Sequence, residues 1–169
     1  GLACLEYVVL NHPSQPRCDE AYMRLGEMYT EDRQLALAIE RYEDLVLYHR
    51  GSRLRPTAQA RIPILRLTLL DSPEYDRNDL LLALSELEDW MARFSTHSMG
   101  KVVDGSRLDC LRRLSASDLG IARFYKRIDN PDGIRFHAQR ARDHAKDADD
   151  ADLAASADDL LRTLTLADS

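Results

Sequence analysis

The sequence has few cysteines, and they follow no recognisable pattern. Its 169 residues contain three, Cys4, Cys18 and Cys110, an odd and scattered set without a C-x-x-C pair. Such a set predicts neither a disulfide framework nor a cysteine-based zinc site. All three lie in segments with helical periodicity, where a cysteine usually serves as a small buried apolar residue. The cysteines therefore do not indicate a cellular compartment.

Long apolar runs and an excess of positive charge are also missing. No stretch approaches the roughly 18 apolar residues that a membrane-spanning helix needs, and the first residues lack the pattern of a signal peptide. The net charge of −6 argues against nucleic acid as a partner, because nucleic-acid-binding domains usually carry a basic excess. With 44% hydrophobic and 31% charged residues, the chain is expected to be a folded, soluble protein with a sizeable core.

Helical periodicity runs through most of the chain, with breaks at short intervals. The breaks are NHPSQP, HRGSRLRP, DSPEYDRND, STHSMGKVVDGS and DNPDG, whose residues are typical of turns. We therefore predict an all-α protein without a sheet. Its eight helices are expected at residues 2–11, 17–30, 33–49, 57–70, 77–94, 105–128, 131–147 and 149–166. Pro63 lies inside the fourth segment, where it removes a backbone hydrogen bond and is expected to kink the helix.

A repeat motif is clearest in EAYMRLGEMYTEDRQLALAIERYEDLVLYH, residues 20–49. It resembles the tetratricopeptide (TPR) pattern of two antiparallel helices at Tyr22, Leu25, Gly26, Tyr29, Ala38, Tyr42 and Leu45. Gly26 and Ala38 occupy positions where small side chains let the two helices approach each other. This requirement explains a glycine in mid-helix, where it costs about 1 kcal/mol relative to alanine. The resemblance predicts a TPR-like helical-hairpin solenoid.

Weaker versions of the motif occur downstream. In residues 105–147 the twelve-residue step recurs from Ala122 to Ile134, which predicts a long helix and a last repeat in which Ala122 is a packing residue. Residues 56–95 are expected to form a degenerate repeat with an insertion. Trp90, at a second-helix position of that repeat, is expected to be a buried packing residue.

The two ends of the chain differ from a complete repeat. Residues 1–13 have second-helix spacing, so we expect a truncated repeat whose first helix lies upstream or whose apolar face is covered by another chain. Residues 148–169, rich in Ala and Asp, are expected to form an acidic capping helix or tail. We interpret residues 1–169 as a single TPR-like domain with one complete repeat, at 17–49.

Three longer stretches resemble the BamD family of bacterial outer-membrane assembly lipoproteins. They are residues 11–49, the segment LSELEDWMARF, and GSRLDCLRRLSASDLGIARFYKR, where the family has L-A-x-x-E-L-x-V-A-x-F-Y. The family is anchored by a lipid on an N-terminal cysteine. Gly1 stands where a leucine is expected in such a lipid-attachment signal, so Cys4 is not the expected lipid site. Any contact with the membrane is expected only through a lipid anchor outside this chain.

The resemblance implies a non-catalytic scaffold on the periplasmic side of the bacterial outer membrane. Its implied partners are proteins: a POTRA domain of a BamA-like barrel protein docked at the C-terminal half, other assembly lipoproteins, and unfolded outer-membrane proteins received at the N-terminal half. No cofactor is implied. The alternatives are another TPR scaffold of the cell envelope and a cytoplasmic TPR adaptor.

Charge is distributed unevenly over the positions expected on the inner face of the solenoid. One end is acidic and the other basic, so the candidate partner-binding residues are Glu20, Met23, Glu27 and Glu31 together with Arg123, Lys126 and Arg127. The basic end is expected to be reinforced by Arg112, Arg113, Arg135, Arg140 and Arg142. Such a dipolar surface could orient docking and raise association rates.

An enzyme is not expected. No G-x-S-x-G, H-E-x-x-H or phosphate-binding loop occurs, and Ser115 with Asp118 is better interpreted as polar residues of a long helix than as a nucleophile and its helper. His137 and His144, seven residues apart, share a helical face with Asp147. These three residues are the best-aligned candidates for a metal site, but we predict no bound metal.

Overall fold

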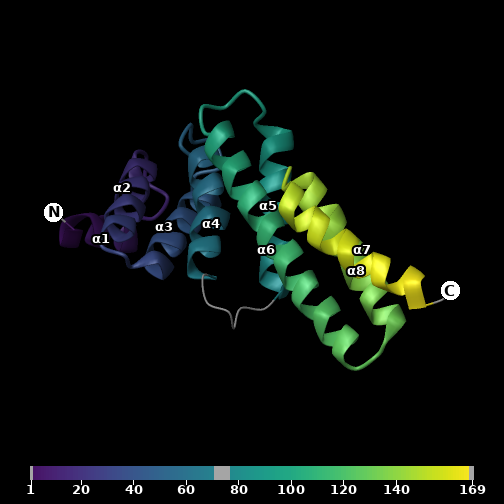
Figure 1. Cartoon of the computed structure of the whole chain (residues 1–169). Helices are drawn as coiled ribbons and strands as arrows, with labels where there is room; N and C mark the ends of the chain where they lie inside the picture. The colour runs from purple at the N-terminus through teal and green to yellow at the C-terminus, as the bar shows by residue number, and fades with distance from the viewer. Residues whose placement is uncertain (1, 71–76, 168–169) are drawn as a thin grey trace. The chain divides into compact units, whose positions relative to one another are not determined.

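The computed structural model describes residues 2–70 and 77–167, and in these residues it contains eight α-helices and no strand. The prediction of an all-α fold is confirmed (Figure 1). The helices are α1 (Leu2–Asn11), α2 (Cys18–Glu31), α3 (Leu35–Tyr48), α4 (Arg55–Leu69), α5 (Arg77–Arg93), α6 (Gly100–Arg127), α7 (Pro131–Asp147) and α8 (Ala151–Ala167).

The predicted boundaries differ most at the start of α6. The sequence predicts a loop through residue 104, whereas α6 begins at Gly100 and includes Gly105. A glycine inside a helix costs about 1 kcal/mol, but Val103 is fully buried in that first turn, and its burial contributes about 1.5–3 kcal/mol. Pro63 is buried inside α4, and the helix continues beyond it to Leu69.

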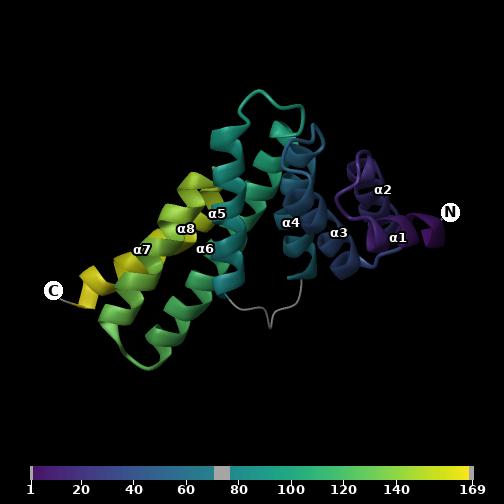
Figure 2. The same ribbon diagram turned by 180° about the vertical axis from the view of Figure 1, so that it is seen from behind.

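The chain divides into two compact units. Unit 1 comprises residues 1–75 and 85–103, and unit 2 comprises residues 76–84 and 104–169. In unit 1, α1 packs on α2, α2 on α3 and α3 on α4, so that consecutive helices lie side by side (Figures 1 and 2). In unit 2, α7 and α8 pack closely against each other.

Unit 1 has a core built from both helices of the complete repeat. Leu25, Ala38, Tyr42 and Leu45 are all fully buried. A side chain added at Gly26 would collide with the ring of Tyr42 on the facing helix α3.

The second half of α5 completes unit 1 through Trp90. Only 1% of its surface is exposed, and its indole Nε1 donates a hydrogen bond of 2.7 Å to the carbonyl oxygen of Pro56 at the start of α4. The rings of Phe94 and His97 pack against it, each with a centroid 5.4 Å away. Trp90 therefore ties α5 to α4.

Unit 2 has a core of small side chains where three helices meet. Ala122, Ala138, Ala141 and Ala157 are fully buried and form one cluster with larger residues of α6, α7 and α8, namely Leu119, Ile134, Leu160 and Leu164. Small residues at a helix contact let the backbones approach closely. Residues 151–167 of the Ala- and Asp-rich end form the helix α8.

Candidate functional site

The expected acidic positions lie along α2, but not all of them face solvent. Glu20 and Glu31 are exposed and Glu27 is partly buried. Met23 is only 8% exposed and belongs to the core of unit 1. The structure thus places Met23 in the packing of its own unit and not on an exposed face.

Two of these carboxylates are already paired with arginines of their own segment. Arg17 lies 3.5 Å from Glu20, and Arg24 lies 3.3 Å from Glu27. Exposed pairs of this kind contribute little to stability, but they neutralise charge that a partner would otherwise meet. The acidic end is weaker than the sequence suggests.

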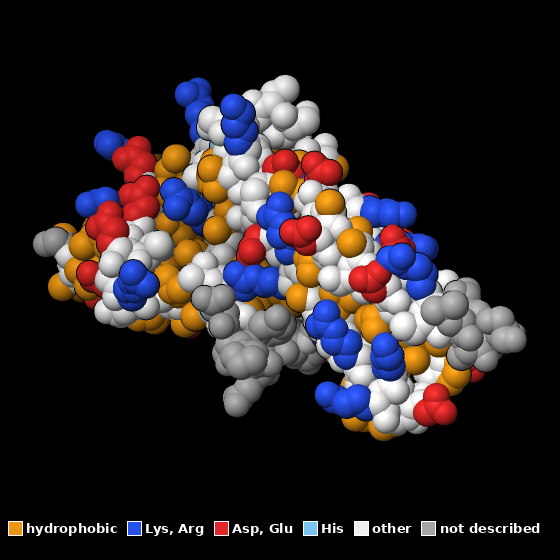
Figure 3. Space-filling view, in the orientation of Figure 1, with side chains coloured by type: hydrophobic (Ala, Val, Ile, Leu, Met, Phe, Trp, Pro, Cys, Tyr) orange, Lys and Arg blue, Asp and Glu red, His pale blue; other side chains and the backbone are white. Residues whose placement is uncertain are grey.

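The expected basic positions lie together on the last two turns of α6. Arg123, Lys126 and Arg127 are all exposed, and none of them forms an ion pair within the described part of the chain. In Figure 3 the Lys and Arg side chains gather over this end of α6.

The five nearby arginines differ from these three cations because they form ion pairs. All five that were expected to reinforce the basic end have acidic partners in unit 2, in the pairs Arg112–Asp150, Arg113–Asp109, Arg135–Asp132, Arg140–Asp118 and Arg142–Asp158. The unpaired positive charge in this region is therefore concentrated at the end of α6.

Two exposed aromatic rings accompany these cations. Phe124 is 47% exposed and Phe136 is 54% exposed. The guanidinium of Arg127 lies 5.8 Å from the centroid of Phe124, and that of Arg140 lies 5.4 Å from the centroid of Phe136. Both distances are within the range of cation–π attraction. We call the six residues Arg123, Phe124, Lys126, Arg127, Phe136 and Arg140 the basic–aromatic patch.

The two phenylalanines lie on the same side of the α6–α7 hairpin. Tyr125 of α6 stacks on His137 of α7, with their centroids 5.6 Å apart. Each phenylalanine precedes one of these two rings by one residue. One residue is a rotation of about 100° around a helix axis, and in two antiparallel helices equal rotations from facing positions lead to the same side. The rings of Phe124 and Phe136 thus flank the Tyr125–His137 stack on one surface.

The buried carboxylate of Asp118 positions residues in and beside the basic–aromatic patch. Asp118 of α6 is fully buried. Arg77 Nη2 donates to its Oδ2 at 2.6 Å, and His137 Nδ1 lies 2.8 Å from its Oδ1. Arg140 Nε lies 3.9 Å from the same carboxylate. Asp118 therefore connects α5, α6 and α7 within unit 2 and fixes both the stacked ring of His137 and the position of Arg140.

Sequence reasoning placed Asp118 correctly on a long helix but did not identify these partners. Its position four residues after the fully buried Leu114 and four before Ala122 puts it on the buried stripe of α6. A charged residue on such a stripe indicates a buried ion pair. The spacing of Asp118 in the sequence could therefore have predicted that its carboxylate is paired.

The candidate metal ligands His137 and His144 both lie on α7, and His137 is bonded to Asp118. In the described residues no group of three His, Cys, Asp or Glu side chains could hold a metal ion. His144 is partly buried, and its Nδ1 has no hydrogen-bond partner. Burial lowers the pKa of His144, as do the charges of Arg77 and Arg140, although Asp118 and Asp147 oppose the shift. Ser115 uses its hydroxyl to donate to Ala141 O at 2.8 Å.

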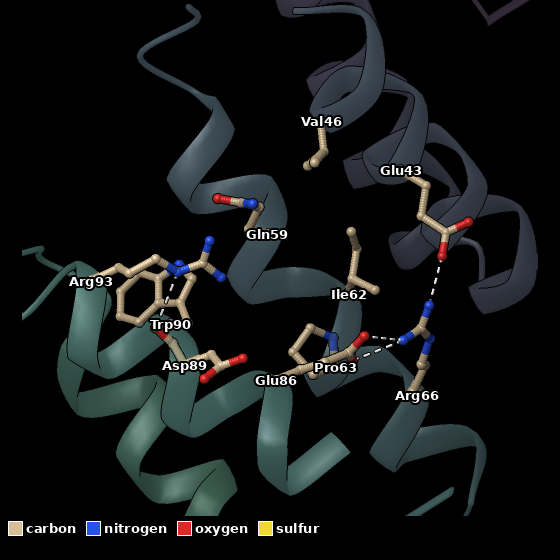
Figure 4. Close-up of a pocket in the computed structure, with 10 residues that line it drawn as sticks. All are labelled: Glu43, Val46, Gln59, Ile62, Pro63, Arg66, Glu86, Asp89, Trp90 and Arg93. Atoms are coloured by element: carbon tan, nitrogen blue, oxygen red, sulfur yellow. Dashed lines mark hydrogen bonds and ion pairs between the residues drawn. The ribbon is translucent and has the colours of Figure 1, made fainter. Parts of the chain in front are cut away.

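Unit 1 contains a groove beside the Trp90 contact (Figure 4). It has a volume of about 290 Å³ and is lined by residues of α3, α4 and α5. Arg66 of α4 crosses one side of it, with Nη1 2.6 Å from Glu86 Oε1 and Nη2 2.7 Å from Glu43 Oε1. These bonds tie three consecutive helices together, with two carboxylates facing the single positive charge of Arg66.

Comparison with known proteins assigns no family. No family model matches the chain, and no curated protein is significantly similar to it. Within the described residues, no helix combines the length and the apolar character needed to cross a membrane.

Proposed function

We propose that this protein is a non-catalytic scaffold that binds protein partners, and that the basic–aromatic patch is its principal docking surface. The observation that carries the proposal is the pairing of cations with exposed rings. Arg127 lies over Phe124 and Arg140 over Phe136, and both rings are about half exposed. Arginine and aromatic side chains are enriched at protein interfaces and contribute much of their binding energy.

The chemistry of the patch favours a protein partner with acidic side chains. A guanidinium binds a carboxylate through charge-assisted hydrogen bonds, often two at once, and each phenyl ring offers apolar area beside that contact. The net charge of the whole chain is −6, so an extended polyanion such as nucleic acid would be repelled by most of the surface. A compact acidic site on a partner would meet only the patch.

The specific assembly that we propose follows from the BamD resemblance. The protein would work on the periplasmic side of the bacterial outer membrane, where unit 2 docks a BamA-like POTRA domain. Other assembly lipoproteins and unfolded outer-membrane proteins are the further proposed partners. The support for this part of the proposal is the three quoted sequence stretches, together with consecutive helices packed as in helical repeats.

The proposal is tested by affinity capture from native envelope membranes with this chain as bait, followed by mass spectrometry. The wild type is compared with the triple variant Arg123→Glu, Lys126→Glu, Arg127→Glu. A control variant, Arg33→Glu, Arg53→Glu, Lys101→Glu, changes the net charge equally at exposed positions of unit 1. We expect a barrel protein with POTRA domains to be captured by the wild type and the control, and lost with the patch variant.

Other outcomes would overturn separate parts of the proposal. Recovery of only cytosolic or peptidoglycan-associated partners would reject the outer-membrane role and leave a different scaffold. Equal capture by the wild type and the patch variant would reject the basic–aromatic patch as the docking surface.

A further inference from the structure

Four aromatic rings form a row across the α6–α7 hairpin. The row runs from Phe124 through Tyr125 and His137 to Phe136, with consecutive ring centroids 5.7, 5.6 and 5.0 Å apart. The two inner rings are stacked, and each outer ring meets its inner neighbour edge to face. The outer phenyl rings are about half exposed, whereas the side chain of His137 is only 16% exposed. The ring of His137 therefore lies deeper than the phenyl rings beside it.

Both inner rings are fixed by contacts beneath them. Tyr125 lies against the backbone of Gly133, where an added methyl group would approach its Cδ1 to 2.6 Å. The Nδ1 of His137 lies 2.8 Å from Oδ1 of the fully buried Asp118. A partner would therefore meet a preformed surface, which lowers the cost of ordering on binding.

The contact with Asp118 determines which nitrogen of His137 carries the proton. The carboxylate of Asp118 forms an ion pair with Arg77 at 2.6 Å, and an ionised carboxylate can only accept hydrogen bonds. The proton of the neutral imidazole must then be on Nδ1, and Nε2 is an acceptor. This Nε2 forms no hydrogen bond in the described residues. Unlike Nδ1 of His144, it is also not a buried atom without a partner, so it is open to solvent.

The middle of the basic–aromatic patch thus differs chemically from its ends. The guanidinium of Arg127 lies over Phe124 at one end of the row, and that of Arg140 lies over Phe136 at the other. Carboxylates of a partner bind such guanidinium groups. A carboxylate cannot bind Nε2 of the neutral His137, because both groups are acceptors. The middle of the patch requires a hydrogen-bond donor.

We propose that His137 determines the specificity of the basic–aromatic patch by accepting, through Nε2, a hydrogen bond from a side-chain hydroxyl of the partner that is flanked by acidic residues. This inference rests on the proposed role of the patch as a docking surface. A side chain rather than the partner's backbone makes the contact, because the more exposed rings of Phe124 and Phe136 stand on either side of His137. Threonine meets both requirements, since its methyl group can pack on a phenyl ring while its hydroxyl donates.

Two acetylated and amidated peptides test this contact. Their sequences are Glu-Glu-Thr-Glu-Glu and Glu-Glu-Val-Glu-Glu, which have the same charge and nearly the same shape, but only threonine donates from its side chain. Each is titrated into the ¹⁵N-labelled full chain, and shifts of the backbone amide signals give Kd. We expect the wild type to bind the threonine peptide about three- to tenfold more tightly, the net effect of one hydrogen bond.

Two variants of His137 separate a binding role from a structural one. His137→Asn keeps a donor near the position of Nδ1 for Asp118 but removes the outward acceptor. His137→Gln has a longer side chain, which keeps an outward acceptor but loses the inward donor. We expect the preference for threonine to disappear in His137→Asn and to persist in His137→Gln. A merely structural role would give the reverse order, because only the glutamine variant leaves Asp118 without this donor.

The position of the proton is measured without any peptide. Long-range ¹H–¹⁵N spectra of the histidine rings show which nitrogen is protonated, and the signals of His137 are identified by their absence in His137→Asn. We expect the proton on Nδ1 of His137 at neutral pH. The exposed His12, whose ring has no hydrogen-bond partner in the described residues, should show a mixture of both forms.

The outcomes distinguish failure of this inference from failure of the proposed function. A proton on Nε2 of His137, equal affinity of the wild type for the two peptides, or a threonine preference that survives in His137→Asn would each overturn the inference. The triple patch variant tests the docking role itself, because it should lose both peptides. If it binds them as tightly as the wild type does, the patch is not the docking surface, and the inference falls with the proposed function.

Discussion

The backbone of Gly26 lies directly against the ring of Tyr42. A methyl group added at Gly26 would approach Tyr42 Cζ to 2.5 Å and Cδ1 to 2.9 Å, well inside van der Waals contact. Unit 2 has the same relationship between Gly133 and Tyr125, where an added methyl group would approach Cδ1 to 2.6 Å. In both units a tyrosine fills the space that a glycine leaves on the facing helix.

We predict that Gly26→Ala destabilises the protein although it improves the intrinsic helix propensity of α2. Tyr42 is fully buried, so its ring cannot move without disturbing the core. Overpacking costs about 1–3 kcal/mol, which exceeds the roughly 1 kcal/mol gained in propensity. Urea denaturation followed by circular dichroism should show a lower free energy of unfolding.

Gly120→Ala is the matched control for this prediction. Gly120 also lies inside a helix, but nothing lies within 4 Å of an added methyl group. We expect a gain of about 0.5–1 kcal/mol there. A gain of the same size at Gly26 would show that Tyr42 adjusts freely and that close packing does not explain the glycine.

The helices could be predicted from the sequence because their periodicity and breaks are local properties. The predicted and observed bounds of α1 and α7 coincide, and most others agree within two residues. The start of α6 was missed because burial of Val103 outweighs the helix-breaking tendency of Gly100 and Gly105. That burial depends on tertiary contacts, which no local pattern contains.

The candidate site was predictable only in part, for the same reason. The exposed cations of α6 follow from helical spacing in the sequence. Whether a cation has an acidic partner depends on distant residues, as Arg112 with Asp150 shows. The partners of Asp118 come from two other helices, α5 and α7, and the roles of Phe124 and Phe136 depend on the register of the α6–α7 hairpin.

We predict that Asp118→Ala destabilises unit 2 by about 3–5 kcal/mol, because removal of one partner leaves a buried charge uncompensated. Arg77, whose side chain is 20% exposed, and His137 would both lose their acceptor. Chemical denaturation measures the loss. Asp159→Ala, which removes an exposed pair with Arg162, should change the free energy of unfolding by less than about 0.5 kcal/mol. If the two variants lose equally little, the Asp118 network contributes little to stability.

We predict that the free energy of unfolding falls as the pH is lowered through the range below 6.5, partly because of His144. Burial, followed by the charges of Arg77 and Arg140, lowers the pKa of this histidine from its ordinary value of 6.5. Between the lowered pKa and 6.5 the unfolded chain binds more protons than the folded one. Stability therefore rises with pH across this window.

The measurement compares denaturation midpoints of the wild type and His144→Gln between about pH 5 and pH 7.5. The variant should show a shallower slope in this window, because the group that resists protonation is gone. His12→Gln, at an exposed position, should keep the wild-type slope. Parallel slopes for the wild type and His144→Gln would exclude His144 as a source of the pH dependence.

We predict that the double variant Phe124→Ala, Phe136→Ala loses partner capture while the protein stays folded. Both rings are about half exposed, so their removal should cost the fold no more than about 1 kcal/mol per residue. The net charge is unchanged, and any lost capture is then due to the lost apolar contacts and to guanidinium groups that are no longer held over a ring. The amount of partner captured from envelope membranes is compared with that of Leu82→Ala, a change at a leucine that is 53% exposed in the same unit. Capture that survives loss of both rings would mean that the cations alone hold the partner, and it would then fall steeply with salt concentration.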